Sequence, residues 1–190
     1  WFGWFGFNGF SQLAMGTFND VTAISKIAVN THLAGAAGTV TGAVLSRLLG
    51  GKTDVIMMLN GALAGLVAIT AEPLAPTPGF AIVIGSIGSV IMYFGTKMLE
   101  NFGLDDVVGA IPVHMFAGVF GTLVVPLTNK STAFSTQFIG TLSVCVFSFV
   151  LSYIIFKTMK ATIGLRISKE AEKLGTDKAE VGVVAYAIRD

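Results

Sequence analysis

His114 is the residue of this sequence with the clearest chemical potential. It is one of two histidines in 190 residues, and it lies inside the uncharged stretch of residues 107–129. An ionisable side chain is costly in an apolar segment of membrane-spanning length, so by default it indicates a functional group facing a cavity. Two interpretations stay open: a histidine hydrogen-bonded to a neighbouring helix, or one that lines a narrow pore or relays a proton. No cysteine, glutamate or second histidine lies at ligand spacing, so we expect no metal there.

The residues around His114 predict open space beside the imidazole. Gly118 and Gly121 follow at i+4 and i+7, positions that share a helix face with His114. Pro112 lacks a backbone N–H and cannot donate to the carbonyl of Val108 one turn earlier. We therefore expect an uncrowded flank beside His114 and a free carbonyl at Val108.

Aromatic rings alternating with glycines open the chain. Trp4, Phe7 and Ser11 fall on one stripe of a helix, at i, i+3 and i+7. One interpretation is an aromatic belt at a membrane–water interface. The other is a set of rings that line a path and attract a cation that is losing its water.

The other polar residues of the apolar stretches have less specific interpretations. Asn60 and Thr70 are expected to bond a neighbouring helix or their own backbone. Asp105 and Asp106 precede a predicted span and are expected to cap it. His32 has small apolar neighbours and is interpreted as a packing or interfacial residue. No nucleophile–base pair is visible, so neither an enzyme nor a cofactor is expected.

Composition indicates the class of protein that must position these side chains. Hydrophobic residues make up 53% of the chain and charged residues only 12%, against about 25% charged in soluble domains. Of the 23 charged residues, 12 lie from residue 157 onward. A soluble globule or a disordered chain is excluded, and a net charge of +1 gives no basis for nucleic-acid binding. The single cysteine, Cys145, excludes an intrachain disulfide. The sequence predicts a membrane protein.

Charged residues divide the chain into six apolar runs. Each has a length suited to one membrane-spanning helix, which needs about 20 residues. We expect an all-α polytopic membrane region over residues 1–160 and a cytoplasmic tail over residues 161–190. The predicted spans are residues 1–18, 27–48, 55–71, 79–99, 107–128 and 134–158. Glycine and alanine at three- and four-residue spacing predict close helix packing.

Basic residues predict the orientation of these spans. Membrane proteins concentrate lysine and arginine in their cytoplasmic loops. With a cytoplasmic tail, the outer loops contain only Lys26 and Lys130. The inner segments then contain Arg47, Lys52, Lys97, Lys157, Lys160 and Arg166.

Four strings of the sequence resemble one known family. They are WFGWFGFN at residues 1–8, LNGALAGLVAIT at 59–70, DDVVGAIPVHMFAGVFGTL at 105–123 and TIGLRIS at 162–168. In this order and spacing they resemble the ammonium transporter (Amt/Mep/Rh) family, in its bacterial-type Amt branch. The resemblance implies the eleven-helix fold of that family, of which this chain corresponds to helices six to eleven, the C-terminal half.

The resemblance also implies roles for individual residues. His114 matches one of the paired pore histidines, and Phe7 matches one of two phenylalanines that gate the outer mouth. Trp4 belongs to the same aromatic cluster as Phe7, and Ser11 matches the serine of the outer site that recruits ammonium. Family members are taken to deprotonate ammonium, pass ammonia along an apolar pore and relay the proton through the histidines.

Two further positions, Asn60 and Thr70, match residues that line or border the family's pore. The resemblance implies a homotrimer in the cell membrane, in contact with lipid, with ammonium or ammonia as cargo and a possible PII-type regulator at the cytoplasmic face. Val181, within the tail string AEVGVVAY at residues 179–186, departs from the family pattern and weakens the regulator prediction.

Other departures concern residues near the outer end. Phe10 stands where the family commonly has a small residue, which is expected to screen Ser11 in part. His32 also departs from the usual residue. Two alternatives to a transporter stay open: an ammonium sensor built on the same fold, and a non-conducting structural subunit.

Overall fold

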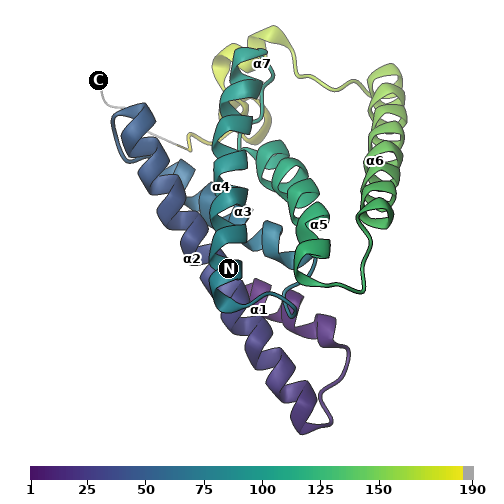
Figure 1. The fold of residues 1–190 in the computed structure, drawn as a ribbon. Helices are drawn as coiled ribbons and strands as arrows, with labels where there is room; N and C mark the ends of the chain where they lie inside the picture. The colour runs from purple at the N-terminus through teal and green to yellow at the C-terminus, as the bar shows by residue number, and fades with distance from the viewer. Residues whose placement is uncertain (186–190) are drawn as a thin grey trace. The chain divides into compact units, whose positions relative to one another are not determined.

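The computed structural model describes residues 1–185, and this part of the chain contains helices, turns and loops but no strand. The all-α prediction is thereby confirmed (Figure 1). The chain divides into two compact units, Trp1–Thr141 and Leu142–Asp190. The elements in chain order are α1 (Phe2–Gly9), η1 (Phe10–Gln12), α2 (Phe18–Gly50), α3 (Val55–Thr70), α4 (Pro78–Asn101), η2 (Ile111–Phe116), α5 (Ala117–Thr128), α6 (Phe134–Thr162), α7 (Lys169–Leu174) and η3 (Asp177–Val181).

All six predicted spans contain helix, but not all of these helices have spanning length. Four segments are long and apolar enough to cross a membrane: Phe18–Gly50, Pro78–Asn101, Ile111–Thr128 and Phe134–Thr162. The apolar helix α3 is shorter, with 16 residues, and α1 has 8. The number of six spans therefore stays a prediction.

The first two predicted spans differ from the helices that the chain forms. Helix α1 ends at Gly9, the turn η1 follows, and Leu13 adopts a left-handed conformation with φ of 57° that stops the helix. Helix α2 then begins at Phe18 instead of residue 27. The cause is a capping box, in which Thr17 accepts a hydrogen bond from the backbone of Asp20 and Asp20 accepts one from the backbone of Thr17.

Helices α2, α3 and α4 pack through glycine at their contacts, and Figure 1 shows the three running side by side. A Cβ atom added to Gly38 of α2 would lie 2.2 Å from the carbonyl oxygen of Gly61 in α3. A Cβ added to Gly85 of α4 would lie 2.2 Å from the carbonyl oxygen of Ala34 in α2. Any larger side chain at either glycine would push the backbones apart, so these small residues determine how closely the helices approach.

One buried amide holds the loop between α3 and α4. The side-chain nitrogen of Asn30 donates to the carbonyl oxygens of Pro73 and Pro76, at 2.9 Å each. In the same loop, Glu72 accepts a 2.9 Å hydrogen bond from the side chain of Asn129, at the end of α5. These bonds tie three elements together at one end of the first unit.

Helix α6 begins in the first unit and continues into the second, and none of its residues is buried. Ser168 caps α7, and beyond it the backbone N–H of Ala185 donates to the carboxylate of Asp177 at 2.9 Å. Backbone hydrogen bonds of this kind lower the pKa of Asp177, because they stabilise its ionised form. The tail string considered above ends at Tyr186, which lies outside the described residues.

Candidate functional site

A cavity of about 520 Å³ lies within the first unit. Elements α1, α3, η2 and α5 contribute its walls, and we name it the Trp4–His114 cavity. Its lining is apolar apart from an indole, two hydroxyls and one imidazole. The lining residues are Trp4, Phe7, Val67, Thr70, Ala71, His114, Gly118 and Thr122.

Two residues of this wall, Trp4 and Thr70, form a short hydrogen-bonded chain. Nε1 of Trp4 donates to the hydroxyl of Thr70 at 2.7 Å, and that hydroxyl donates to the carbonyl oxygen of Leu66 at 2.6 Å. A hydroxyl has one donor and two acceptor lone pairs, so one acceptor position of Thr70 is left. The Thr70 side chain can thus accept a hydrogen bond on the cavity wall but has no donor to offer.

The ring of Phe7 lies next to that of Trp4. Their centroids are 5.9 Å apart and their planes are tilted by 46°. Phe7 is 66% exposed, so its ring is not held in place by a packed core. The cavity therefore has two adjacent aromatic rings, one anchored by a hydrogen bond and one largely exposed.

His114 lies in η2, a segment of wide π-type turns that precedes α5. Such turns occur mostly singly and frequently at functional sites. The His114 side chain is exposed, and within residues 1–185 its imidazole makes no hydrogen bond. Its neighbours Pro112 and Val113 are buried, so the backbone of η2, more than any contact of the ring, determines where the imidazole lies.

The two glycines after His114 have different surroundings. Gly118 lines the cavity, in agreement with the expected open flank. Gly121 does not lie beside the imidazole: it is buried, and a Cβ added there would lie 2.4 Å from the carbonyl oxygen of Ala68 in α3. The expectation of a second open position at Gly121 was wrong, because that residue brings α5 close to α3.

Ser11 does not line the Trp4–His114 cavity. It lies in η1, and its hydroxyl donates to the carbonyl oxygen of Phe7 at 3.4 Å, a long and exposed bond. The helical stripe of Trp4, Phe7 and Ser11 is thus only partly reproduced, since α1 ends at Gly9.

Asn60 and Asp106 contact the backbone at the start of η2 and just before it. The side-chain nitrogen of Asn60 donates to the carbonyl oxygen of Val108 at 3.0 Å. The carboxylate of Asp106 accepts from the backbone N–H groups of Ala110 and Ile111, at 2.9 and 2.8 Å. Asp105 and Asp106 also line a separate cavity of about 230 Å³, together with Gly109 and Pro112.

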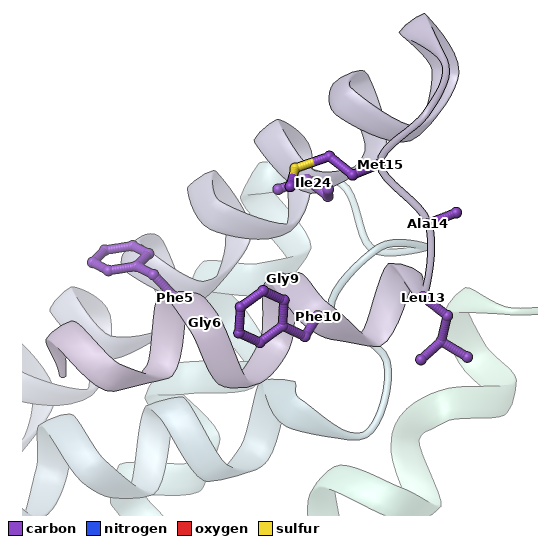
Figure 2. Close-up of a pocket in the computed structure, with 8 residues that line it drawn as sticks. All are labelled: Phe5, Gly6, Gly9, Phe10, Leu13, Ala14, Met15 and Ile24. Atoms are coloured by element: carbon purple, nitrogen blue, oxygen red, sulfur yellow. The ribbon is translucent and has the colours of Figure 1, made fainter.

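An apolar pocket of about 400 Å³ lies on the other side of α1, and Figure 2 shows its lining. Phe10 contributes to this pocket and not to the Trp4–His114 cavity. Close to the same helix, the ring of His32 lies 5.4 Å from that of Trp1 and 6.3 Å from that of Phe5. His32 therefore packs among aromatic rings, apart from the imidazole of His114.

Three lining residues, Val67, Ala71 and Thr122, were not singled out from the sequence. Thr122 could have been found, because it lies eight positions after His114 and four after Gly118, on the same helix face. Val67 and Ala71 carry no chemical signal of their own. Among the described residues, no group of three or more histidine, cysteine, aspartate or glutamate side chains could hold a metal ion.

Comparison with known proteins agrees with the resemblance in the sequence. Residues 1–186 match the family described as Ammonium Transporter Family. Ammonium transporter Amt2 of Archaeoglobus fulgidus is 40% identical over 98% of this chain and 43% of its own length. This chain therefore spans less than half the length of that relative.

Solved structures show the same fold. A structure titled Sensor Amt Protein superposes with a TM-score of 0.87 at 33% identity, over 95% of this chain and 46% of that one. Mep2 from Candida albicans superposes with a TM-score of 0.81 at 25% identity, over 96% of this chain and 44% of that one.

Proposed function

Because the chain belongs to the ammonium transporter family, we propose that it carries ammonium or ammonia across a membrane along a path that includes the Trp4–His114 cavity. The observation that supports this most directly is the composition of the cavity wall. One small apolar space holds two aromatic rings, a hydroxyl with a free acceptor position and an imidazole with no partner among the described residues.

The chemistry of the cargo fits such a wall. A bare ammonium ion is very costly in an apolar channel, whereas neutral ammonia is not. The faces of the Trp4 and Phe7 rings attract the cation as it loses water, which supports a recruiting role for them. In this proposal ammonium loses a proton near these rings, ammonia passes along the apolar wall, and His114 assists the proton's passage.

Further assignments for single residues belong to the same proposal. Phe7 acts as a gate, which the exposed position of its ring beside Trp4 supports. Ser11 contributes to recruitment from outside the Trp4–His114 cavity, and Thr70 and Asn60 border the path. The exposed position of Ser11 supports an encounter role more than a role in the dry part of the path.

The wider assembly is also proposed from the family. We place the chain in a cell membrane as a multi-pass protein with a cytoplasmic C-terminal tail, assembled as a homotrimer, with a PII-type regulator as a possible partner of the tail. The strongly apolar sequence of α6 supports contact with lipid or with other helices.

A sensor is the second function to consider, because the Sensor Amt Protein has this fold. A sensor binds ammonium at the same wall but signals instead of conducting. A non-conducting structural subunit would neither bind nor conduct. Ammonium-dependent stabilisation of the purified protein without uptake would favour the sensor, and no effect of ammonium in either assay would favour the structural subunit.

Uptake of radiolabelled methylammonium tests the proposal. The complete gene product is expressed in cells that lack their own ammonium transporters, with His114→Ala as the variant and His32→Ala as the matched control. We expect saturable uptake in the wild type, retention in His32→Ala and a loss of about a hundredfold in His114→Ala, the range found for a positioned proton-transfer group. Wild-type uptake by the His114→Ala variant would contradict the role of His114.

A further inference from the structure

We propose that Asn60 is a positioning residue for His114: its side-chain amide holds the backbone turn that starts the π-type segment η2. The role in transport rests on the proposed function above, but the positioning itself does not. The positioning is inferred from three features at the start of η2: the hydrogen bond from Asn60 to Val108, the tightly packed Gly109, and Pro112.

The carbonyl of Val108 accepts its hydrogen bond from outside its own segment. In a regular helix the residue four positions later would donate to it, but that residue is Pro112, which has no N–H. The next backbone N–H, that of Val113, donates to Gly109 at 3.1 Å. The Asn60 amide supplies the donor to Val108, at 3.0 Å, from α3.

The backbone of Gly109 lies directly against the Asn60 amide. Its φ of +73° is in the region that favours glycine. A Cβ atom at this position would lie 2.7 Å from the side-chain nitrogen of Asn60. The turn from Val108 to Ala110 thus accommodates the Asn60 side chain closely, and a change at either residue affects the other.

The consequence reaches His114 through the backbone. The imidazole has no hydrogen bond within the described part of the chain, so its place in the cavity follows from the course of η2. A π-type turn contains one residue more than an α-turn, and each residue of an α-helix corresponds to a rotation of about 100°. The Val108 carbonyl lies just before η2, in the turn that leads into it. If that turn shifts when Val108 loses the Asn60 donor and the π-type turn rewinds as an α-turn, His114 rotates away from Gly118 and Thr122.

Two substitutions separate the hydrogen bond from packing. Asn60→Asp keeps the size of the side chain but replaces the donor with an oxygen that faces the Val108 carbonyl. Asn60→Ala removes donor and bulk together. The matched control is Asn129→Ala, which removes an amide donor to Glu72 at the opposite end of the same helical segment.

The first readout needs no transport. Purified protein is treated with diethylpyrocarbonate, and mass spectrometry measures the modification rate of His114 relative to His32, which packs among other rings. We expect this ratio to change in both Asn60 variants and to stay at the wild-type value in Asn129→Ala. An unchanged ratio in folded Asn60→Asp would overturn the proposal.

The second readout is the kinetics of methylammonium uptake, normalised to folded protein. We expect both Asn60 variants to lower the maximal rate about tenfold to a hundredfold with little change in KM, since misplacement of a reacting group by about 1 Å has effects of this size. If wild-type protein shows no uptake, the proposed function fails while the modification ratio still decides the role of Asn60. Failure of both Asn60 variants to fold would also overturn the proposal, because the bond would then support the bundle as a whole.

Discussion

At the scale of single residues, Trp4 presents its ring and not its N–H to the cavity. Nε1 is already bonded to Thr70, whose own proton is directed to Leu66. The pair therefore fixes the plane of the indole and leaves the cavity wall with an acceptor. Such a wall suits a cargo that is rich in N–H donors, such as ammonium or ammonia.

Removing either member of this pair is expected to weaken uptake. Trp4→Phe removes the hydrogen bond from Nε1 to Thr70, and Thr70→Val removes that bond together with the one to the Leu66 carbonyl. At about 0.5–1.5 kcal/mol for a neutral hydrogen bond, we expect about a twofold to tenfold loss of methylammonium uptake for Trp4→Phe and a loss at least as large for Thr70→Val. The double variant should be little worse than the worse single one, because both changes delete the same bond. Trp1→Phe, at a ring that contacts His32, is the control. Fully additive effects would contradict coupling between the two residues.

At the scale of elements, glycine determines the approach of α2, α3 and α4. At Gly38 the facing group is a backbone carbonyl, which cannot move aside as a flexible side chain could. Even one added methyl group at such a glycine would therefore force the helices apart. The close packing of these helices depends on backbone-to-backbone contact as much as on buried side chains.

Gly38→Ala is expected to destabilise the protein by about 1–3 kcal/mol through overpacking. Gly140→Ala in α6 is the matched control, since no atom lies within 4 Å of a Cβ added there. The control should be neutral or more stable by about 0.5–1 kcal/mol, the usual gain of alanine over glycine within a helix. Thermal unfolding of the purified protein measures both. An unchanged midpoint for Gly38→Ala would show that the helices separate without cost.

The elements also show which parts of the architecture can be predicted from sequence. The spacing of charges located α3, α4 and α6 to within a few residues, since these helices are bounded by polar links. It misplaced the start of α2, because Asp20 and Lys26 interrupt the apolar pattern although the helix continues through both. The capping box of Thr17 and Asp20 could have predicted the start of α2, but a prediction based on the spacing of charges does not take it into account.

Sequence predicted some parts of the site correctly and missed others. His114, Trp4, Phe7 and Thr70 were singled out from the sequence and do line one cavity. The π-type turn was not predicted, because it depends on contacts from other helices, such as that of Asn60, and not on a local pattern. Ser11 was assigned to a continuous helical stripe, and the early end of α1 places it elsewhere.

At the scale of the whole molecule, orientation follows from where the few basic residues lie. Lys157 and Lys160 lie near the C-terminal end of α6, the most apolar segment, and Arg166 follows it, so the C-terminal tail is expected in the cytoplasm. The loop containing Lys130 is expected outside. This arrangement is a prediction about the chain in a membrane.

Reporter fusions test this orientation in bacterial cells. Green fluorescent protein fused after residue 190 should fluoresce, because it folds in the cytoplasm. Alkaline phosphatase inserted after Lys130 should be active, because it needs the outer compartment to form its disulfides. As a control, phosphatase inserted after Lys52 should be inactive. The reverse pattern at these sites would show the opposite orientation.

The amide of Asn30 has a practical consequence for epitope tagging. Residues 71–77 form an irregular loop, usually the first choice for inserting a tag, yet its carbonyls at Pro73 and Pro76 share one buried donor. An insertion there would strip both bonds at once. The link after α2 is the better choice, since Lys52 and Thr53 are exposed and nothing lies within 4 Å of a Cβ added at Gly51. A peptide placed after Lys52 lengthens a solvated turn and leaves the neighbouring helices joined as they are.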